Sequence, residues 1–95
     1  MAYKGPSLQT LRVFQVAARE LSFKRAAAEL NVTPSAVSHQ IKGLEQQLQF
    51  SLFRRLNRAL GLTPAGEELL QAVDLHLSQL QRAVGQVSRR HGAPA

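Results

Sequence analysis

The sequence of 95 residues contains no cysteine, which excludes disulfide bonds and thiolate metal sites. No apolar run approaches the roughly 18 residues of a membrane span, and the first ten residues lack the apolar core of a signal peptide. Acidic residues are few, since 6 Asp and Glu stand against 12 Lys and Arg and leave a formal charge of +6. We therefore expect one small cytoplasmic, nucleoid-associated domain with a polyanionic partner, nucleic acid ahead of an acidic membrane surface.

Catalytic groupings are also lacking. The three histidines, His39, His76 and His91, do not have metal-ligand spacing, and Asp74 is the only aspartate. The chain has no Gly-rich phosphate loop. The sequence therefore predicts neither an enzyme nor a bound cofactor or metal ion.

Helical periodicity with recognisable start and stop residues is what the sequence does contain. After Ser7, a capping residue, apolar side chains recur every three or four residues as far as Leu21. Ser22 caps a second predicted helix, which Asn31 closes because asparagine tolerates a left-handed backbone. The pattern predicts two short helices joined closely in the chain.

Two Thr-Pro pairs predict two further helix starts, because the hydroxyl caps the helix and proline lacks an amide that would have no partner. Thr33-Pro34 begins a helix that ends near Leu48 to Gln49, and Thr63-Pro64 begins a long one. Gly43 lies inside the third helix and costs about 1 kcal/mol relative to alanine, which is tolerable if packing needs a small residue there. Between these helices, residues 51–55 and 59–63 are predicted to form a small β-hairpin.

The second and third helices together indicate a helix-turn-helix. Ala27 is a small residue where two helices cross, Asn31 lies in the turn, and Val37 is a buried anchor early in the next helix. In this motif the second helix enters the major groove of DNA. The side opposite its apolar stripe carries short hydroxyls, an imidazole and a cation, which suit base edges and phosphates, namely Ser35, Ser38, His39 and Lys42.

Basic residues next to this helix provide a second candidate surface. Arg54, Arg55 and Arg58 lie in or beside the hairpin, where arginine binds phosphate or enters the minor groove, unless one of them pairs with a carboxylate. Lys24 and Arg25, in the first turn of the second helix, are candidate backbone contacts. Ser22 precedes them and is included among the predicted DNA-binding residues.

The long last helix carries a two-position heptad seam. Its spacing of 3, 4, 3, 4 and 3 is typical of a coiled coil, and we name the seam by its members, Leu70, Val73, Leu77, Leu80, Val84 and Val87. The first turns, around Leu69, Leu70 and Val73, are expected to pack on the domain itself. Three short helices cannot cover the rest, so we predict the seam as a dimer interface. A two-fold protein suits a pseudo-palindromic site in double-stranded DNA.

Residues 7 to 70 closely resemble the N-terminal DNA-binding domain of LysR-type transcriptional regulators. The resemblance depends on three motifs in combination: SFKRAAAELNVTPSAVSHQIKGLE, LFRR and LTPAGEELL. Within the family, the sequence is most similar to the activators of glycine cleavage and β-lactamase expression.

The resemblance implies a mainly α, winged helix-turn-helix fold of three helices plus a hairpin wing, followed by a long linker helix for dimerisation. It implies that the start of the third helix recognises DNA through Thr33, Pro34, Ser35, Ser38, His39 and Lys42. It also implies wing contacts from Asn57 and Arg58, with Arg55 close to the DNA backbone. The expected parts are an arm (1–6), the DNA-binding domain (7–63, with the helix-turn-helix at about 23–42), the linker helix (64–90) and a tail (91–95).

Family members also carry a C-terminal domain that binds a small-molecule effector, and they often form tetramers. The resemblance implies that this chain stops before such a domain. The alternative to a DNA-binding domain is a helical interaction module that dimerises without binding DNA.

Three residues depart from the family pattern. Pro34 replaces a frequent glutamine and cannot bind adenine bidentately, so base contacts are expected to shift to Ser35, Ser38 or His39. His39 replaces a frequent arginine, and Arg54 replaces a frequent acidic residue and adds a candidate phosphate contact.

Overall fold

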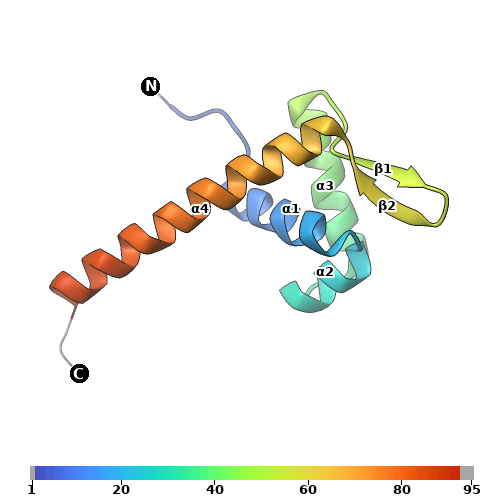
Figure 1. The fold of residues 1–95 in the computed structure, drawn as a ribbon. Coiled ribbons are helices and arrows are strands. Elements are labelled where there is room, and N and C mark those ends of the chain that lie inside the picture. The colour runs from blue at the N-terminus through green and yellow to red at the C-terminus, as the bar shows by residue number, and fades with distance from the viewer. Residues whose placement is uncertain (1, 93–95) are drawn as a thin grey trace.

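The computed structural model describes residues 2–92 as helices surrounding a small core, with one β-hairpin at the edge (Figure 1). The elements in chain order are α1 (Leu8–Glu20), α2 (Phe23–Leu30), α3 (Pro34–Leu48), β1 (Phe53–Leu56), β2 (Ala59–Leu62) and α4 (Pro64–His91). This is the predicted winged helix-turn-helix with a long final helix. Within the described residues, no helix is both long and apolar enough to cross a bilayer.

All four helices begin at the predicted hydroxyl caps. The side chain of each cap accepts a hydrogen bond from the backbone N–H three residues later, at Ser7, Ser22, Thr33 and Thr63. Asn31 ends α2 with φ 59°, and Gln49 ends α3 with φ 71°. These local signals position α2 and α3 as the two helices of a helix-turn-helix.

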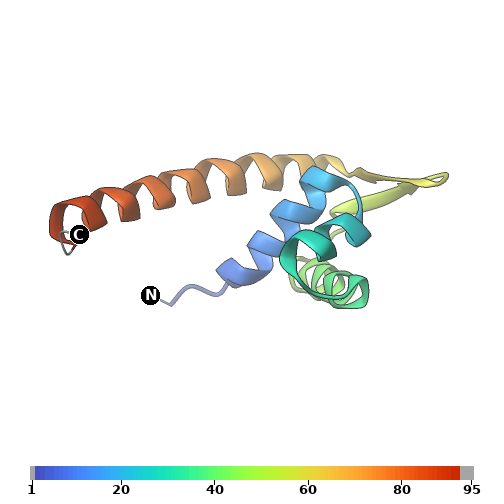
Figure 2. The same cartoon turned by 90° about the horizontal axis from the view of Figure 1, so that it is seen from below.

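The core lies where α1, α2 and α3 meet. Phe14 of α1 is fully buried, as is Val37 of α3, and the small residues Ala26 and Ala27 let α2 approach both helices. Figure 2 shows α1, α2 and α3 grouped beneath the N-terminal half of α4. The predictions of Ala27 as a small residue at a helix crossing and of Val37 as a buried anchor are therefore confirmed.

Gly43 has a different setting from the one we expected. It is exposed, and a Cβ built on it would have no neighbour within 4 Å. Packing within residues 2–92 therefore does not require glycine at this position.

The hairpin is antiparallel and shorter than predicted. Phe53 pairs with Leu62 and Leu56 pairs with Ala59, so Asn57 and Arg58 form the turn. Asn57 has φ 56°, a left-handed conformation that asparagine tolerates. The aromatic ring of Phe53 lies edge-on to Phe14 at 5.8 Å and to Phe23 at 5.3 Å, which anchors the base of the wing to the core.

Helix α4 is about 42 Å long at 1.5 Å per residue, and its two halves have different environments. Val73 is only 6% exposed and belongs to the domain's own core, against which Leu70 and Leu77 also pack. Beyond Leu77, α4 extends past every other element (Figures 1 and 2), and the remaining members of the seam are exposed, namely Leu80, Val84 and Val87. The expected packing of the first turns, around Leu70 and Val73, agrees with this structure. Leu77, which we expected to lie beyond the short helices, also packs on the core, because a heptad pattern looks the same whichever surface covers it. The rest of the seam as a dimer interface stays a prediction.

Both ends of the chain lie partly outside the described residues. The predicted arm includes Met1, which is not described, and Tyr3 donates a hydrogen bond to the carbonyl oxygen of Pro6 at 2.7 Å. The predicted tail overlaps α4 at His91, and its residues 93–95 are not described.

Candidate nucleic-acid interface

Helix α3 has the two-sided character that its sequence predicts. Val37 and Ile41 face the core and are buried, whereas Ser35, His39 and Lys42 on the other side are exposed. Ser38 is half-buried, at the border between the two sides. Short polar side chains therefore cover a helix surface that is open to a partner.

The start of α3 is also exposed, at Thr33 and Pro34. The hydroxyl oxygen of Thr33 accepts a hydrogen bond from the N–H of Ala36 at 3.1 Å, so its lone pairs are partly committed to capping. Its hydroxyl hydrogen is free to point outward. Pro34 has no backbone donor and presents only its ring.

A hollow of about 170 Å³ separates α3 from the wing. Ser38 and Lys42 line it from α3, and Arg54 and Arg55 line it from β1. The fold therefore brings together the predicted helix contacts and two of the predicted wing contacts, although 12 to 17 residues separate Ser38 and Lys42 from them in the chain.

A second hollow, of about 480 Å³, lies between the wing and the start of α2. Ser22, Arg55 and Arg58 line it, so Arg55 contributes to both hollows. The Ser22 hydroxyl accepts a hydrogen bond from the N–H of Arg25 at 3.1 Å and thus caps α2. The positive end of the helix dipole adds to the two guanidinium groups here.

The other predicted contact residues line neither hollow. They are exposed on or next to α2, α3 and the wing, and they are Lys24, Arg25, Thr33, Pro34, Ser35, His39 and Asn57.

Charge pairing leaves this surface strongly cationic. The one ion pair within residues 2–92 joins Arg19 of α1 to Asp74 of α4 and includes no residue of the wing. Six basic side chains therefore have no carboxylate partner in the described structure: Lys24, Arg25, Lys42, Arg54, Arg55 and Arg58. The possibility that Arg54 or Arg55 pairs with a carboxylate is not realised, and the surface suits a polyanion.

Glu45 is a supporting residue that the sequence analysis missed. Its carboxylate accepts hydrogen bonds from the backbone N–H groups of Leu52 at 2.7 Å and Phe53 at 3.2 Å. It thereby ties α3 to the first residues of the wing. The sequence does contain a signal for this role, because Glu45 lies within the apolar stripe of Ile41, Leu44 and Leu48. A carboxylate that is partly buried in such a stripe needs a hydrogen-bond partner.

Residues 2–92 contain no cluster of three or more His, Asp or Glu side chains that would hold an ion. The polar groups that line the two hollows are hydroxyl and cationic groups together with the carboxylate of Glu45, among apolar side chains such as Phe23 and Leu60.

Comparison with known proteins agrees with this geometry. Residues 8–67 match the model of the bacterial regulatory helix-turn-helix proteins of the lysR family. The chain is 50% identical over 90 residues to the glycine cleavage system transcriptional activator of Escherichia coli K12, covering 95% of this chain and 30% of that protein. It is 50% identical over 82 residues to the transcriptional activator AmpR of Citrobacter freundii, covering 86% of this chain and 27% of AmpR.

A solved structure with the same fold is a complex of the BenM DBD with catB site 1 DNA. It superposes with a TM-score of 0.86 at 30% identity and covers 95% of this chain and 100% of that one. The chain spans less than a third of the length of the curated relatives, which are named as transcriptional activators and not as enzymes. With the family model covering most of the winged helix-turn-helix, the chain belongs to the LysR family of bacterial regulatory helix-turn-helix proteins.

Proposed function

We propose that this chain binds double-stranded DNA sequence-specifically, as the DNA-binding domain of a bacterial transcriptional regulator. Helix α3 enters the major groove, and the wing contacts the minor groove or the backbone. The observation that carries the proposal is the meeting of the hydroxyl-bearing side of α3 with unpaired wing arginines around one hollow. The DNA-bound BenM structure, with its matching fold, supports it.

Affinity and selectivity are assigned to different side chains. The wing arginines, with Lys24, Arg25 and Lys42, displace counterions from phosphates and supply affinity that is independent of sequence. Ser35, Ser38 and His39 contact base edges, because short side chains let α3 approach the groove floor and can donate or accept hydrogen bonds. Thr33 and Ser22 contribute mainly by holding the helix starts in place.

Two copies pair through the exposed part of the seam. Leu80, Val84 and Val87 are 46 to 57% exposed, and alone they would leave an apolar stripe in water. An apolar groove lined by residues of α1 and α4, among them Leu8, Leu11 and Leu77, continues that stripe toward the domain. A dimer would bind two half-sites of a pseudo-palindromic operator.

The chain spans only part of the length of the curated relatives. Because the chain matches only 27 to 30% of its relatives, we propose that a further domain binds a small-molecule effector and that the full protein forms dimers or tetramers. As a regulator of transcription, it works in the cytoplasm at the nucleoid.

Protection mapping on a library of genomic fragments tests the proposal. The chain should protect paired half-sites whose centres are about 10 base pairs, or a multiple of that, apart. If the purified chain dimerised but bound no duplex DNA at low salt, the chain would instead be an interaction module. The exposed seam by itself is consistent with that alternative as well.

A further inference from the structure

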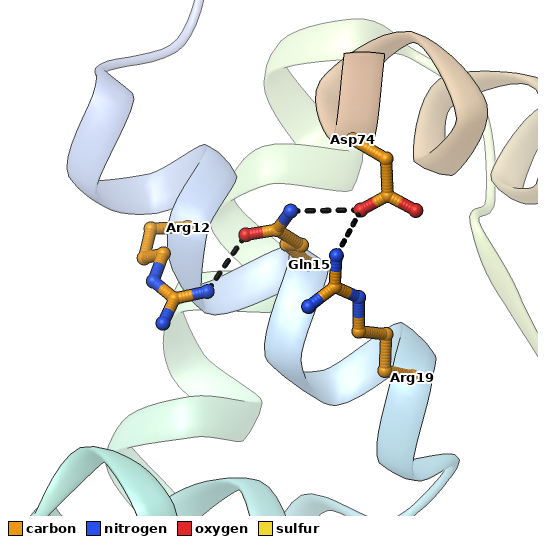
Figure 3. Close-up of polar contacts among 4 residues, drawn as sticks. All are labelled: Arg12, Gln15, Arg19 and Asp74. Atoms are coloured by element: carbon orange, nitrogen blue, oxygen red, sulfur yellow. Dashed lines mark hydrogen bonds and ion pairs between the residues drawn. The ribbon is translucent and has the colours of Figure 1, made fainter. Parts of the chain in front are cut away.

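Four polar side chains form a chain of hydrogen bonds where α1 crosses α4 (Figure 3). Arg12 donates from Nη1 to Oε1 of Gln15 at 2.7 Å, and Gln15 donates from Nε2 to Oδ1 of Asp74 at 2.7 Å. Arg19 donates from Nη2 to the same Asp74 oxygen at 2.8 Å. We call Arg12, Gln15, Arg19 and Asp74 the α1–α4 clamp.

Gln15 makes the clamp more than a surface ion pair. It is 5% exposed, the one buried polar side chain among residues 2–92, and both ends of its amide are hydrogen-bonded. Arg19 and Asp74 have side chains that are 56% and 39% exposed, so salt and solvent weaken their attraction. The bond from Gln15 to Asp74 has a buried donor and is directional, and losing it leaves the buried amide NH2 of Gln15 without an acceptor.

The position of the clamp on α4 magnifies its effect. From Asp74 to the end of α4 at His91 the helix runs about 25 Å, at 1.5 Å per residue. Apolar contacts around Val73 and Leu77 hold α4 against α1, but they are non-directional and tolerate rotation. A rotation of about 10° at Asp74 would move the far end by about 4 Å, more than the rise of about 3.4 Å per base pair of DNA.

We propose that Asp74, held by Gln15, is a positioning residue that sets the angle at which α4 leaves the DNA-binding domain. In a dimer joined through the far half of α4, that angle determines the separation of the two α3 helices. Asp74 thereby determines which half-site spacing the dimer accepts. This inference rests on the proposed function, because it assumes a dimer that binds paired half-sites.

The angle is measured first without DNA. Because the chain has no cysteine, spin labels are introduced through Ala28→Cys on α2 and Gln86→Cys on α4, both exposed, and labelled chain is diluted with unlabelled chain. The labels should report one narrow distance distribution. In an Asp74→Ala background it should widen by about 3 Å, the displacement expected for about 10° of rotation at Gln86, about 18 Å along α4 from Asp74.

Control variants separate the clamp from charge and folding effects. Arg19→Ala removes only the exposed ion pair of the clamp, and Glu68→Ala removes a carboxylate from an exposed position on α4. Both variants should keep the narrow distance distribution. The double variant Gln15→Leu/Asp74→Leu replaces both partners by apolar groups, which avoids a buried unpaired amide and preserves folding. It should widen the distribution as Asp74→Ala does, and an unchanged width in both variants overturns the inference.

Spacing selectivity is then measured on DNA selected from a random library with the unmodified chain. Inserting or removing one base pair between half-sites should weaken binding of the unmodified dimer about tenfold, and that of Asp74→Ala less than about threefold. Affinity for a single half-site should be the same for both proteins. A widened distribution with an unchanged spacing preference overturns the inference, whereas a dimer that binds no DNA refutes the proposed function as well.

Discussion

Arg58 lies in the turn of the wing, exposed and without a carboxylate partner in the described structure. Its side chain lines the hollow next to the start of α2, and we propose that it contacts phosphate in the complex. This role concerns charge, and it therefore predicts an effect on all DNA sequences alike.

Arg58→Ala should weaken binding to selected and random DNA equally. Losing one phosphate contact in each subunit should reduce the slope of log affinity against log salt concentration by about 0.9 per subunit, or about 1.8 for the dimer. Titrations at several salt concentrations measure that slope. Arg82→Ala, which removes the same charge from the exposed far half of α4, is the control and should leave the slope nearly unchanged. An unaltered slope for Arg58→Ala would rule out its phosphate contact.

Ser38 differs from Arg58 because it is half-buried at the border between α3 and the wing. Ser38→Ala should reduce the preference for selected over random DNA by about 0.5 to 1.5 kcal/mol, the usual range for one hydrogen bond, or roughly two- to tenfold. Competition binding with both DNAs measures this ratio, and Ser88→Ala on α4 provides a matched control. Equal losses on both DNAs would make Ser38 a phosphate contact and not a base contact.

At the scale of elements, the link between α3 and the wing depends on Glu45. Its carboxylate is the acceptor for Leu52 and Phe53, and Phe53 in turn packs between Phe14 and Phe23. The wing arginines are useful only if the hairpin keeps its position relative to α3.

Glu45→Ala should destabilise the domain and weaken DNA binding beyond the stability loss. Two hydrogen bonds to a charged acceptor are removed, each worth about 1.5 to 3 kcal/mol, and the buried N–H of Leu52 is left unpaired. Thermal melting and DNA titration measure the two effects. Glu45→Gln keeps an acceptor and should recover most of the stability. If Glu45→Ala melted at the same temperature as the unmodified chain, Glu45 would not hold the wing to α3.

Sequence patterns predicted the helices better than the wing. The hydroxyl caps, the two Thr-Pro pairs and Asn31 define helix ends through backbone groups three or four residues away. They therefore mark these ends independently of the tertiary structure. Three of the four strand ends lie one or two residues away from the predicted ones, and only the start at Ala59 agrees, because a four-residue strand has too few alternations to define its ends. The anchoring of the wing by Phe53 depends on α1 and α2, which local patterns do not include.

At the scale of the whole molecule, the far half of α4 is the part that lacks a partner within the chain. Leu80→Lys combined with Val84→Lys should convert the dimer to a monomer, because two charges would enter an apolar interface. Sedimentation equilibrium measures the mass. The melting temperature of the DNA-binding domain itself should hardly change, since both side chains are already exposed.

The matched control is Gln81→Lys with Gln86→Lys, which adds the same charge at exposed polar positions of α4. It should remain dimeric. A double-lysine seam variant that stays dimeric would show that the copies pair through another surface.

The sequence by itself determined the helix starts, the helix-turn-helix, the polar side of α3 and the heptad pattern, because capping and periodicity act between neighbours in the chain. Tertiary structure alone decided that Leu77 packs against the core while Leu80 remains exposed. It also decided that Gln15 meets Asp74, 59 residues away, and that Arg55 lines both hollows. Such contacts depend on how helices cross, and no spacing along one helix specifies the surface that will cover it.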